Sequence, residues 1–169
     1  MRALSHSEVA AVFNCTYSDH SVVMHGGYRE PMYIPGMDVV EIRYTLDHTA
    51  SALYEAAHWY IAGRRRRRNT DYGYFYEPPP RSGMHRVRFE DVEIEAQSVE
   101  VLLAEAAGSQ FQPSADDVDV PLFLLEAFSS RILERARERR QVGLPNRADK
   151  FRVALWLERN RTRMLVSGG

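Results

Sequence analysis

Hydrophobic residues recur at every third or fourth position in several segments of the chain, the spacing that gathers side chains on one face of an α-helix. The strongest such segment runs from Ser51 to Gly63, where no proline interrupts the pattern and a glycine stands at the end. Asp47 or Thr49 is expected to cap it, because a side-chain oxygen there can accept a hydrogen bond from a free N–H group of the first turn. The pattern as a whole predicts helices at residues 7–13, 51–63, 93–107, 122–139 and 147–160.

Alternation of apolar and polar side chains predicts strands elsewhere. Residues 39–44 fit a strand, and residues 31–36 form an extended segment bounded by prolines. Aromatic residues alternate over 71–76 and predict another strand, whereas residues 81–88 are expected to be an exposed loop. The expected fold class is therefore α+β, a single domain over residues 1–169 that is mostly helical around a small sheet.

Composition narrows the class of protein only slightly. With 169 residues, of which 44% are hydrophobic, the chain is long enough to bury one substantial core. Its formal net charge of −1 gives no overall attraction to nucleic acid, and the single cysteine, Cys15, excludes an internal disulfide framework. The N-terminal residues lack the apolar core of a signal peptide and no apolar run could span a bilayer, so a cytoplasmic protein without a membrane partner is expected.

Directly after the strongest helix comes a run of five arginines, Arg64 to Arg68. Such runs occur at nucleic-acid and other polybasic sites. A solvated helix end explains the run as well, because positive charges there complement the helix dipole. The second interpretation is favoured, and the steering of an acidic partner is the alternative.

The candidate chemistry lies on two of the predicted helices. Tyr54 and His58 stand four residues apart and therefore share a helix face, with Glu55 beside them. This is the spacing of a His-Glu-x-x-His metal helix in which tyrosine replaces the first histidine. Glu93 and Gln97 are likewise four apart on the helix at 93–107, although the helix dipole alone would favour an acidic residue in its first turn. We expect the side chains of residues 54, 55, 58 and 93 to converge on one pocket.

Several sequence blocks occur together in the order and at the separations found in one known family. They are Tyr33–Pro35, Ser51–Gly63, Asp71–Tyr76, Phe89–Glu93 with Gln97, and Ser114–Asp116. From about Tyr33 to Asp117 the chain thereby resembles the elongation factor P hydroxylase family.

The resemblance implies a metal-dependent hydroxylase that uses dioxygen to hydroxylate the modified lysine of elongation factor P, its expected partner. By position, His58 matches the second histidine ligand, and Glu55 matches the glutamate between the ligands, for which a catalytic role is expected. Glu93, in preference to Glu90, matches the third ligand, and Tyr54 occupies the place of the first histidine. Divalent iron is the cofactor implied, with zinc or another divalent metal as the alternative, because a set of two histidines and one carboxylate leaves coordination positions open.

Tyr54 leaves three interpretations open. A phenolate can bind a metal, since a neighbouring cation favours the charged form. Alternatively a loop histidine, one of His25, His48 and His85, supplies the lost ligand. In the third interpretation the metal site is degenerate, and the hydroxyl of Tyr54 is hydrogen-bonded inside the cavity.

The tyrosines of the predicted strand at 71–76 face one side of it. That face most simply packs on the core, but Tyr72 and Tyr74, with Gln97, are the expected substrate-binding residues, because aromatic rings can line a slot for a cationic lysine arm. Two other functions are alternatives. One is a zincin-like metallopeptidase, in which Glu55 polarises a metal-bound water, and the other is a degenerate, non-catalytic member that binds elongation factor P.

Overall fold

The computed structural model describes residues 2–74, 81–115 and 120–166, and side chains as far as residue 161. The helices are α1 (His6–Thr16), α2 (Thr49–Ile61), α3 (Gly83–Ala107), α4 (Leu122–Val142) and α5 (Asn146–Val166). The strands are β1 (Val22–Tyr28), β2 (Met32–Ile34) and β3 (Val40–Thr45), and the short 3₁₀ helices are η1 (Ser18–His20), η2 (Arg66–Arg68) and η3 (Thr70–Gly73). The predicted α+β class, mostly helical around a small sheet, is confirmed.

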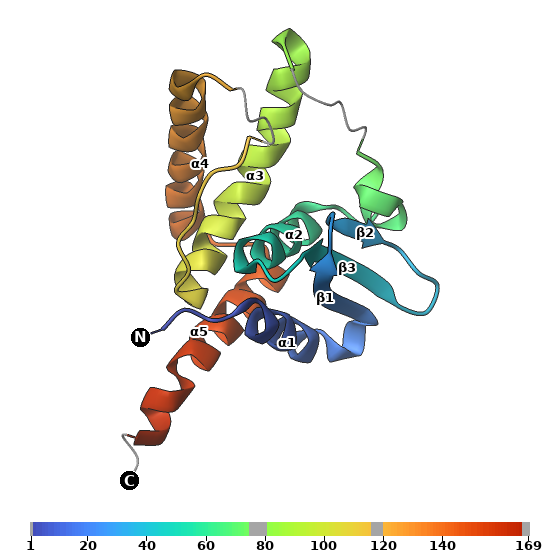
Figure 1. Ribbon diagram of the computed structural model, residues 1–169, viewed down its shortest axis with the longest axis vertical. Coiled ribbons are helices and arrows are strands. Elements are labelled where there is room, and N and C mark those ends of the chain that lie inside the picture. Colours follow the sequence, from blue (N-terminus) through green and yellow to red (C-terminus); the bar gives the residue numbers. More distant parts are fainter. Residues whose placement is uncertain (1, 75–80, 116–119, 167–169) are drawn as a thin grey trace.

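Helix α2 occupies the centre of the molecule, with the sheet on one side and α3 and α4 on the other (Figure 1). It packs against β3, α1 and α3, and eight of its thirteen residues are buried. The long α5 crosses beneath it and packs against α1 and α3. Because neighbours surround α2 on nearly every side, its polar side chains are held inside the protein.

The sheet has the order β1-β3-β2, with β1 parallel and β2 antiparallel to the central β3. Strand β3 was predicted, and β2 lies within the extended segment predicted at 31–36. Strand β1 was missed, because the stretch that contains Gly26 and Gly27 is polar. A side chain at Gly26 would collide with the ring of Tyr44 and the carbonyl of Leu46. Glycine is therefore required there by close packing, in a strand that only the pairing with β3 specifies.

The predicted strand at 71–76 is wrong over the residues that the structure describes. Residues 70–73 form η3, in which Asp71 and Tyr72 have φ angles of 46° and 59°. The carboxylate of Asp71 accepts a hydrogen bond from the backbone N–H of Tyr33 at 2.8 Å, and the Tyr72 ring stacks on the Tyr33 ring with centroids 4.2 Å apart. These contacts with β2 hold the segment in its turn, while Tyr76 lies outside the described residues.

The predicted loop at 81–88 is also wrong, because α3 begins at Gly83, ten residues before the predicted start at Glu93. The first turns of α3 contain few buried residues, so their sequence lacks the amphipathic pattern that predicts a helix. Contacts with α4 support them instead: Glu90 accepts a hydrogen bond from Arg131 at 2.7 Å, and the two helices share a second small apolar core. That core consists of Ile94, Val101, Phe128, Ile132 and Ala136.

The predicted caps of α2 are wrong as well. His48 is the residue at the N-cap, and its side chain makes no capping hydrogen bond. Ser51 instead accepts a hydrogen bond from the N–H of Thr45 at 3.0 Å, which ties the first turn of α2 to the end of β3. Packing within the core thus takes the place of a cap.

The arginine run is not uniformly solvated. Arg67 is half-buried, and its guanidinium group donates to the carbonyl of Ala62, just after α2, at 3.1 Å. Its own carbonyl accepts the hydroxyl hydrogen of Tyr33 at 2.8 Å. Arg67 is therefore part of the fold, whereas Arg64, Arg65, Arg66 and Arg68 are exposed, as predicted for a solvated helix end.

Over the ranges that the structure describes, no helix combines the length and the apolar character that crossing a membrane requires.

Candidate active site between the two central helices

The predicted site residues meet where α2 packs against α3. Tyr54 and His58 lie one turn apart on α2, with ring centroids 4.5 Å apart, and Glu93 faces them from α3. The exposed fractions of His58 and Glu93 are only 7% and 4%. The polar faces that the sequence predicts on α2 and on α3 therefore meet inside the protein.

Glu93 is the centre of the cluster. One carboxylate oxygen, Oε2, accepts hydrogen bonds from Tyr54 Oη at 2.7 Å and from Gln97 Nε2 at 3.0 Å. The other, Oε1, lies 3.4 Å from His58 Nε2. That nitrogen is buried, and among the described residues it has no hydrogen-bond partner of good geometry.

The electrostatics of the cluster follow from this arrangement. Burial by itself would raise the pKa of Glu93, but the charge and close approach of His58 and the hydrogen bonds from Gln97 and Tyr54 lower it below the ordinary value. Burial opposes charge on His58, yet the negative charges of Glu93 and Glu55 raise its pKa. Burial and the adjacent Glu93 raise the pKa of Tyr54 well above its ordinary value, so Tyr54 is here a neutral phenol that donates to the carboxylate.

Gln97 is saturated by contacts within the protein. It is fully buried, and its amide donates to Glu93 and to the Ser114 carbonyl, the latter at 2.7 Å. Its oxygen accepts from the Ser114 N–H at 3.0 Å. Gln97 therefore holds the carboxylate of Glu93 and ties the segment after α3 to the site, and its predicted substrate-binding role stays a prediction.

Two further carboxylates are buried beside this cluster. Glu55, on α2, is 7% exposed, and Glu100, seven residues after Glu93 on α3, is 5% exposed. Burial and the charges of Glu93 and Glu55 raise the pKa of Glu100 well above its ordinary value. Sequence reasoning missed Glu100, although Glu93, Gln97 and Glu100 follow the i, i+4, i+7 spacing of one helix face.

Burial also raises the pKa of Glu55 to about 7, with the charge of His58 opposing the shift and those of Asp71 and Glu93 adding to it. An acid whose pKa is higher in the folded than in the unfolded state destabilises the fold as pH rises from the unfolded toward the folded value, because the unfolded chain loses its proton first. Glu55→Gln should therefore raise the free energy of unfolding at pH 8, by up to about 3 kcal/mol, and change it little at pH 4. Urea unfolding of both proteins at the two pH values measures this; an equal effect at both would contradict the assignment.

The two tyrosines predicted to bind substrate lie next to His58. The Tyr72 ring centroid is 6.4 Å and the Tyr74 ring centroid 6.3 Å from that of His58. Tyr72 is buried, and its hydroxyl has no hydrogen-bond partner among the described residues, whereas Tyr74 is partly exposed. Tyr54 and Tyr74, both partly exposed, are thus neighbours of the buried histidine.

The alternative ligands lie elsewhere. Glu90 pairs with Arg131 on α4, and His25, on β1, lies 3.2 Å from the Glu41 carboxylate. Over the described ranges, no group of three or more histidine, cysteine, aspartate and glutamate side chains is placed to hold a metal ion. With Tyr54 in place of a histidine, the site presents one imidazole and one carboxylate at its centre.

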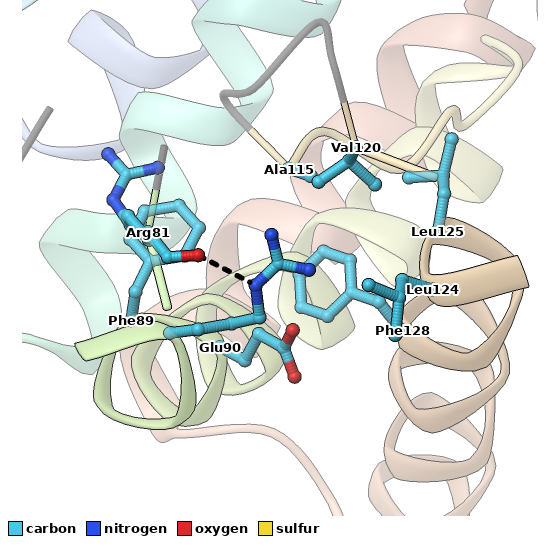
Figure 2. Close-up of a pocket in the computed structure, with 9 residues that line it drawn as sticks. Arg81, Phe89, Glu90, Ala115, Val120, Leu124, Leu125 and Phe128 are labelled. Atoms are coloured by element: carbon cyan, nitrogen blue, oxygen red, sulfur yellow. Dashed lines mark hydrogen bonds between the residues drawn. The ribbon is translucent and has the colours of Figure 1, made fainter. Parts of the chain in front are cut away.

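Glu90 instead lines a separate, partly open pocket between the starts of α3 and α4 (Figure 2). The pocket is lined by Arg81, Arg86, Phe89, Glu90, Ala115, Val120, Leu124, Leu125 and Phe128. None of the residues clustered around Glu93 lines it. Glu93 rather than Glu90 is consequently the carboxylate that meets His58.

An α+β fold whose central helix presents a histidine to a carboxylate of the neighbouring helix is the arrangement expected of the family that the sequence resembles. The chain belongs to the elongation factor P hydroxylase family, which residues 12–166 match. It is 36% identical over 152 residues to the elongation factor P lysine hydroxylase of Haemophilus influenzae, an alignment that covers 88% of this chain and 85% of that protein.

Proposed function

We propose that this chain hydroxylates the modified lysine of elongation factor P at the cluster formed by Tyr54, His58 and Glu93. Family membership supports the reaction and the substrate. The observation that carries the choice of site is the buried pair of His58 Nε2 and Glu93 Oε1, 3.4 Å apart between the two central helices.

His58 and Glu93 offer two donor atoms to a divalent metal ion. Metal–ligand distances to nitrogen and oxygen are about 2.0 to 2.2 Å, so two donor atoms 3.4 Å apart are within reach of one cation. The lack of a well-aligned hydrogen bond at His58 Nε2 leaves that atom available as a ligand. Imidazole and carboxylate suit iron, which we propose as the native metal, and a bound iron would supply the activation of dioxygen that side chains alone cannot. Tyr54 can join as a third ligand only by losing the proton that it shares with Glu93.

The protein's own residues would prepare the substrate. Glu93, whose pKa is lowered, and Glu55, once the pH exceeds its pKa of about 7, place negative charge beside His58, which favours the amino group of a lysine arm. Tyr54 and Tyr74 both place aromatic rings next to His58, where they can contact the aliphatic part of the arm and attract its charge. Because the pKa of Glu55 is about 7, its carboxyl group can hold or release a proton near neutral pH, as a general acid or base must.

The experiment is a direct assay with purified protein, divalent iron, a reductant and elongation factor P that carries its lysine modification. Mass spectrometry of the modified peptide should show the gain of one oxygen atom, and His58→Ala should abolish it. Elongation factor P without the modification is the matched control for the substrate.

One observation favours a second function. The hydroxyl group of Tyr54 donates to the carboxylate proposed to bind metal, as it would in a degenerate site. If the parent protein binds modified elongation factor P but adds no oxygen with any divalent metal supplied, hydroxylation is wrong and a binding role replaces it.

A further inference from the structure

The exposed arginines beside the proposed site are the feature that hydroxylation does not yet use. Arg64, Arg65, Arg66 and Arg68 follow directly after α2, and all four are exposed. Among the residues that the structure describes, none of the four forms a salt bridge with an acidic side chain. The loop therefore presents concentrated positive charge to a partner.

Specific contacts hold this loop next to the candidate active site. Arg67 anchors it, because its guanidinium group bonds to the Ala62 carbonyl at the end of α2. The guanidinium group of Arg66 lies 4.3 Å from the centroid of the Tyr74 ring, and that ring is 6.3 Å from the His58 ring. The positive charge of the loop thus begins one aromatic ring away from the candidate active site.

Acidic side chains occupy the interior next to the loop. Glu55, Glu93 and Glu100 are buried in and beside the candidate active site, whereas the four arginines are exposed. The buried carboxyl groups favour a cationic arm over a polyanion such as RNA, and the exposed arginines attract acidic groups. A partner whose acidic surface surrounds a protruding cationic arm complements both parts.

We propose that Arg64, Arg65, Arg66 and Arg68 form a docking surface for an acidic face of the substrate protein, around the lysine arm that reaches the candidate active site. This inference rests on the proposed function and names the part of the substrate that the protein recognises beyond the arm. The surface should mainly raise the association rate, because exposed complementary charges speed association and their effect falls as salt screens them.

The test is binding of modified elongation factor P over a series of salt concentrations, measured by stopped-flow and equilibrium fluorescence. The rim variant, Arg64→Ala/Arg65→Ala/Arg68→Ala, removes charge from the docking surface and spares both Arg66, which contacts Tyr74, and the structural Arg67. Its matched control, Arg137→Ala/Arg140→Ala/Arg161→Ala, removes the same charge from exposed positions on α4 and α5. Thermal melts of both variants verify folding.

The rim variant should bind about tenfold more weakly at low salt, mostly through a slower association rate, and approach the parent at high salt. Elongation factor P with alanine in place of its modified lysine should still bind in an arginine-dependent manner. Equal affinity and salt dependence for the rim variant and the control variant would overturn the docking surface while leaving hydroxylation intact. An arginine-dependent affinity for single-stranded RNA, with no such dependence for elongation factor P, would also overturn it. A parent protein that neither binds nor hydroxylates elongation factor P would reject the proposed function, and the docking surface with it.

Discussion

Replacing Tyr54 by histidine is expected to raise the affinity of the protein for divalent iron at least about tenfold, because it adds a neutral nitrogen donor to a pocket that already holds His58 and Glu93. The Tyr54 ring lies 4.5 Å from the His58 ring, and its hydroxyl lies 2.7 Å from Glu93. Imidazole is smaller than phenol and can occupy this space without displacing α2. It also binds a metal without the deprotonation that burial makes costly for Tyr54.

The measurement is an anaerobic titration of metal-stripped protein with divalent iron in competition with a chromogenic chelator. Tyr54→Phe is the matched control, since it removes the hydrogen bond to Glu93 and adds no donor. His58→Ala in the Tyr54→His background should return the affinity to the parent value or lower. Should Tyr54→His bind no more iron than Tyr54→Phe, the pocket has lost more than one ligand, and the binding role gains support.

The second large effect is expected from Glu93→Gln, which should lower the free energy of unfolding of the metal-free protein by about 2 to 3 kcal/mol at pH 6. The amide keeps the volume of the carboxylate, so the loss reports charge rather than a cavity. His58 and Tyr54 are both left without the anion that they face. The cost falls below that of an ordinary broken buried ion pair, because His58 can lose its proton and Glu55 and Glu100 lose a repelling neighbour.

The loss of stability in Glu93→Gln should depend on pH, in a direction that follows from the two pKa shifts. The pKa of His58 is raised in the fold, so its contribution is fully present below its unfolded value of about 6.5 and is lost as pH rises through the folded value. The pKa of Glu93 is lowered, so its contribution is present above its unfolded value and is lost as pH falls through the folded value. The difference between parent and variant should therefore be largest from about pH 5 to 6.5 and shrink on either side.

Glu100→Gln is the matched control for Glu93→Gln, because it makes the same change two turns later on the same helix. Burial holds the pKa of Glu100 well above its ordinary value, so this group is neutral, and its replacement by an amide should not destabilise the fold. Urea unfolding from pH 4 to 8 compares the three proteins. An equal loss in both variants would show that α3 requires carboxylates at both positions for packing, and that the pairing with His58 is not the cause.

Local pattern was sufficient for the helices whose apolar stripe is continuous. Residues 51–63 combine strong helix-forming residues with apolar side chains at helical spacing, and the structure has α2 at Thr49–Ile61. The same is true of α4 and α5, which begin within one residue of their predicted starts and extend three and six residues beyond their predicted ends. Where one face of a helix packs on the core, apolar residues recur in its sequence with the helical period, and the helix can be predicted.

Prediction failed where distant residues decide the local conformation. Strand β1 exists through pairing with β3, and the turn at Asp71 is held by the backbone of Tyr33 in β2. The first turns of α3 pack on α4, which follows them by more than thirty residues. None of these partners is visible in the local pattern, because the free energy that specifies the conformation comes from contacts between segments.

The candidate site divides in the same way. The sequence by itself determined that Tyr54 and His58 share one helix face and that Glu93 and Gln97 share another, because side chains four residues apart on a helix must lie together. Only the tertiary structure decided that the two faces meet, that the Tyr54 hydroxyl donates to Glu93, and that the Gln97 amide donates to the Ser114 carbonyl. Helical periodicity is a property of consecutive residues, whereas the meeting of α2 and α3 depends on how the whole chain packs its apolar surfaces, and the burial that shifts the pKa values of these groups exists only once that packing is complete.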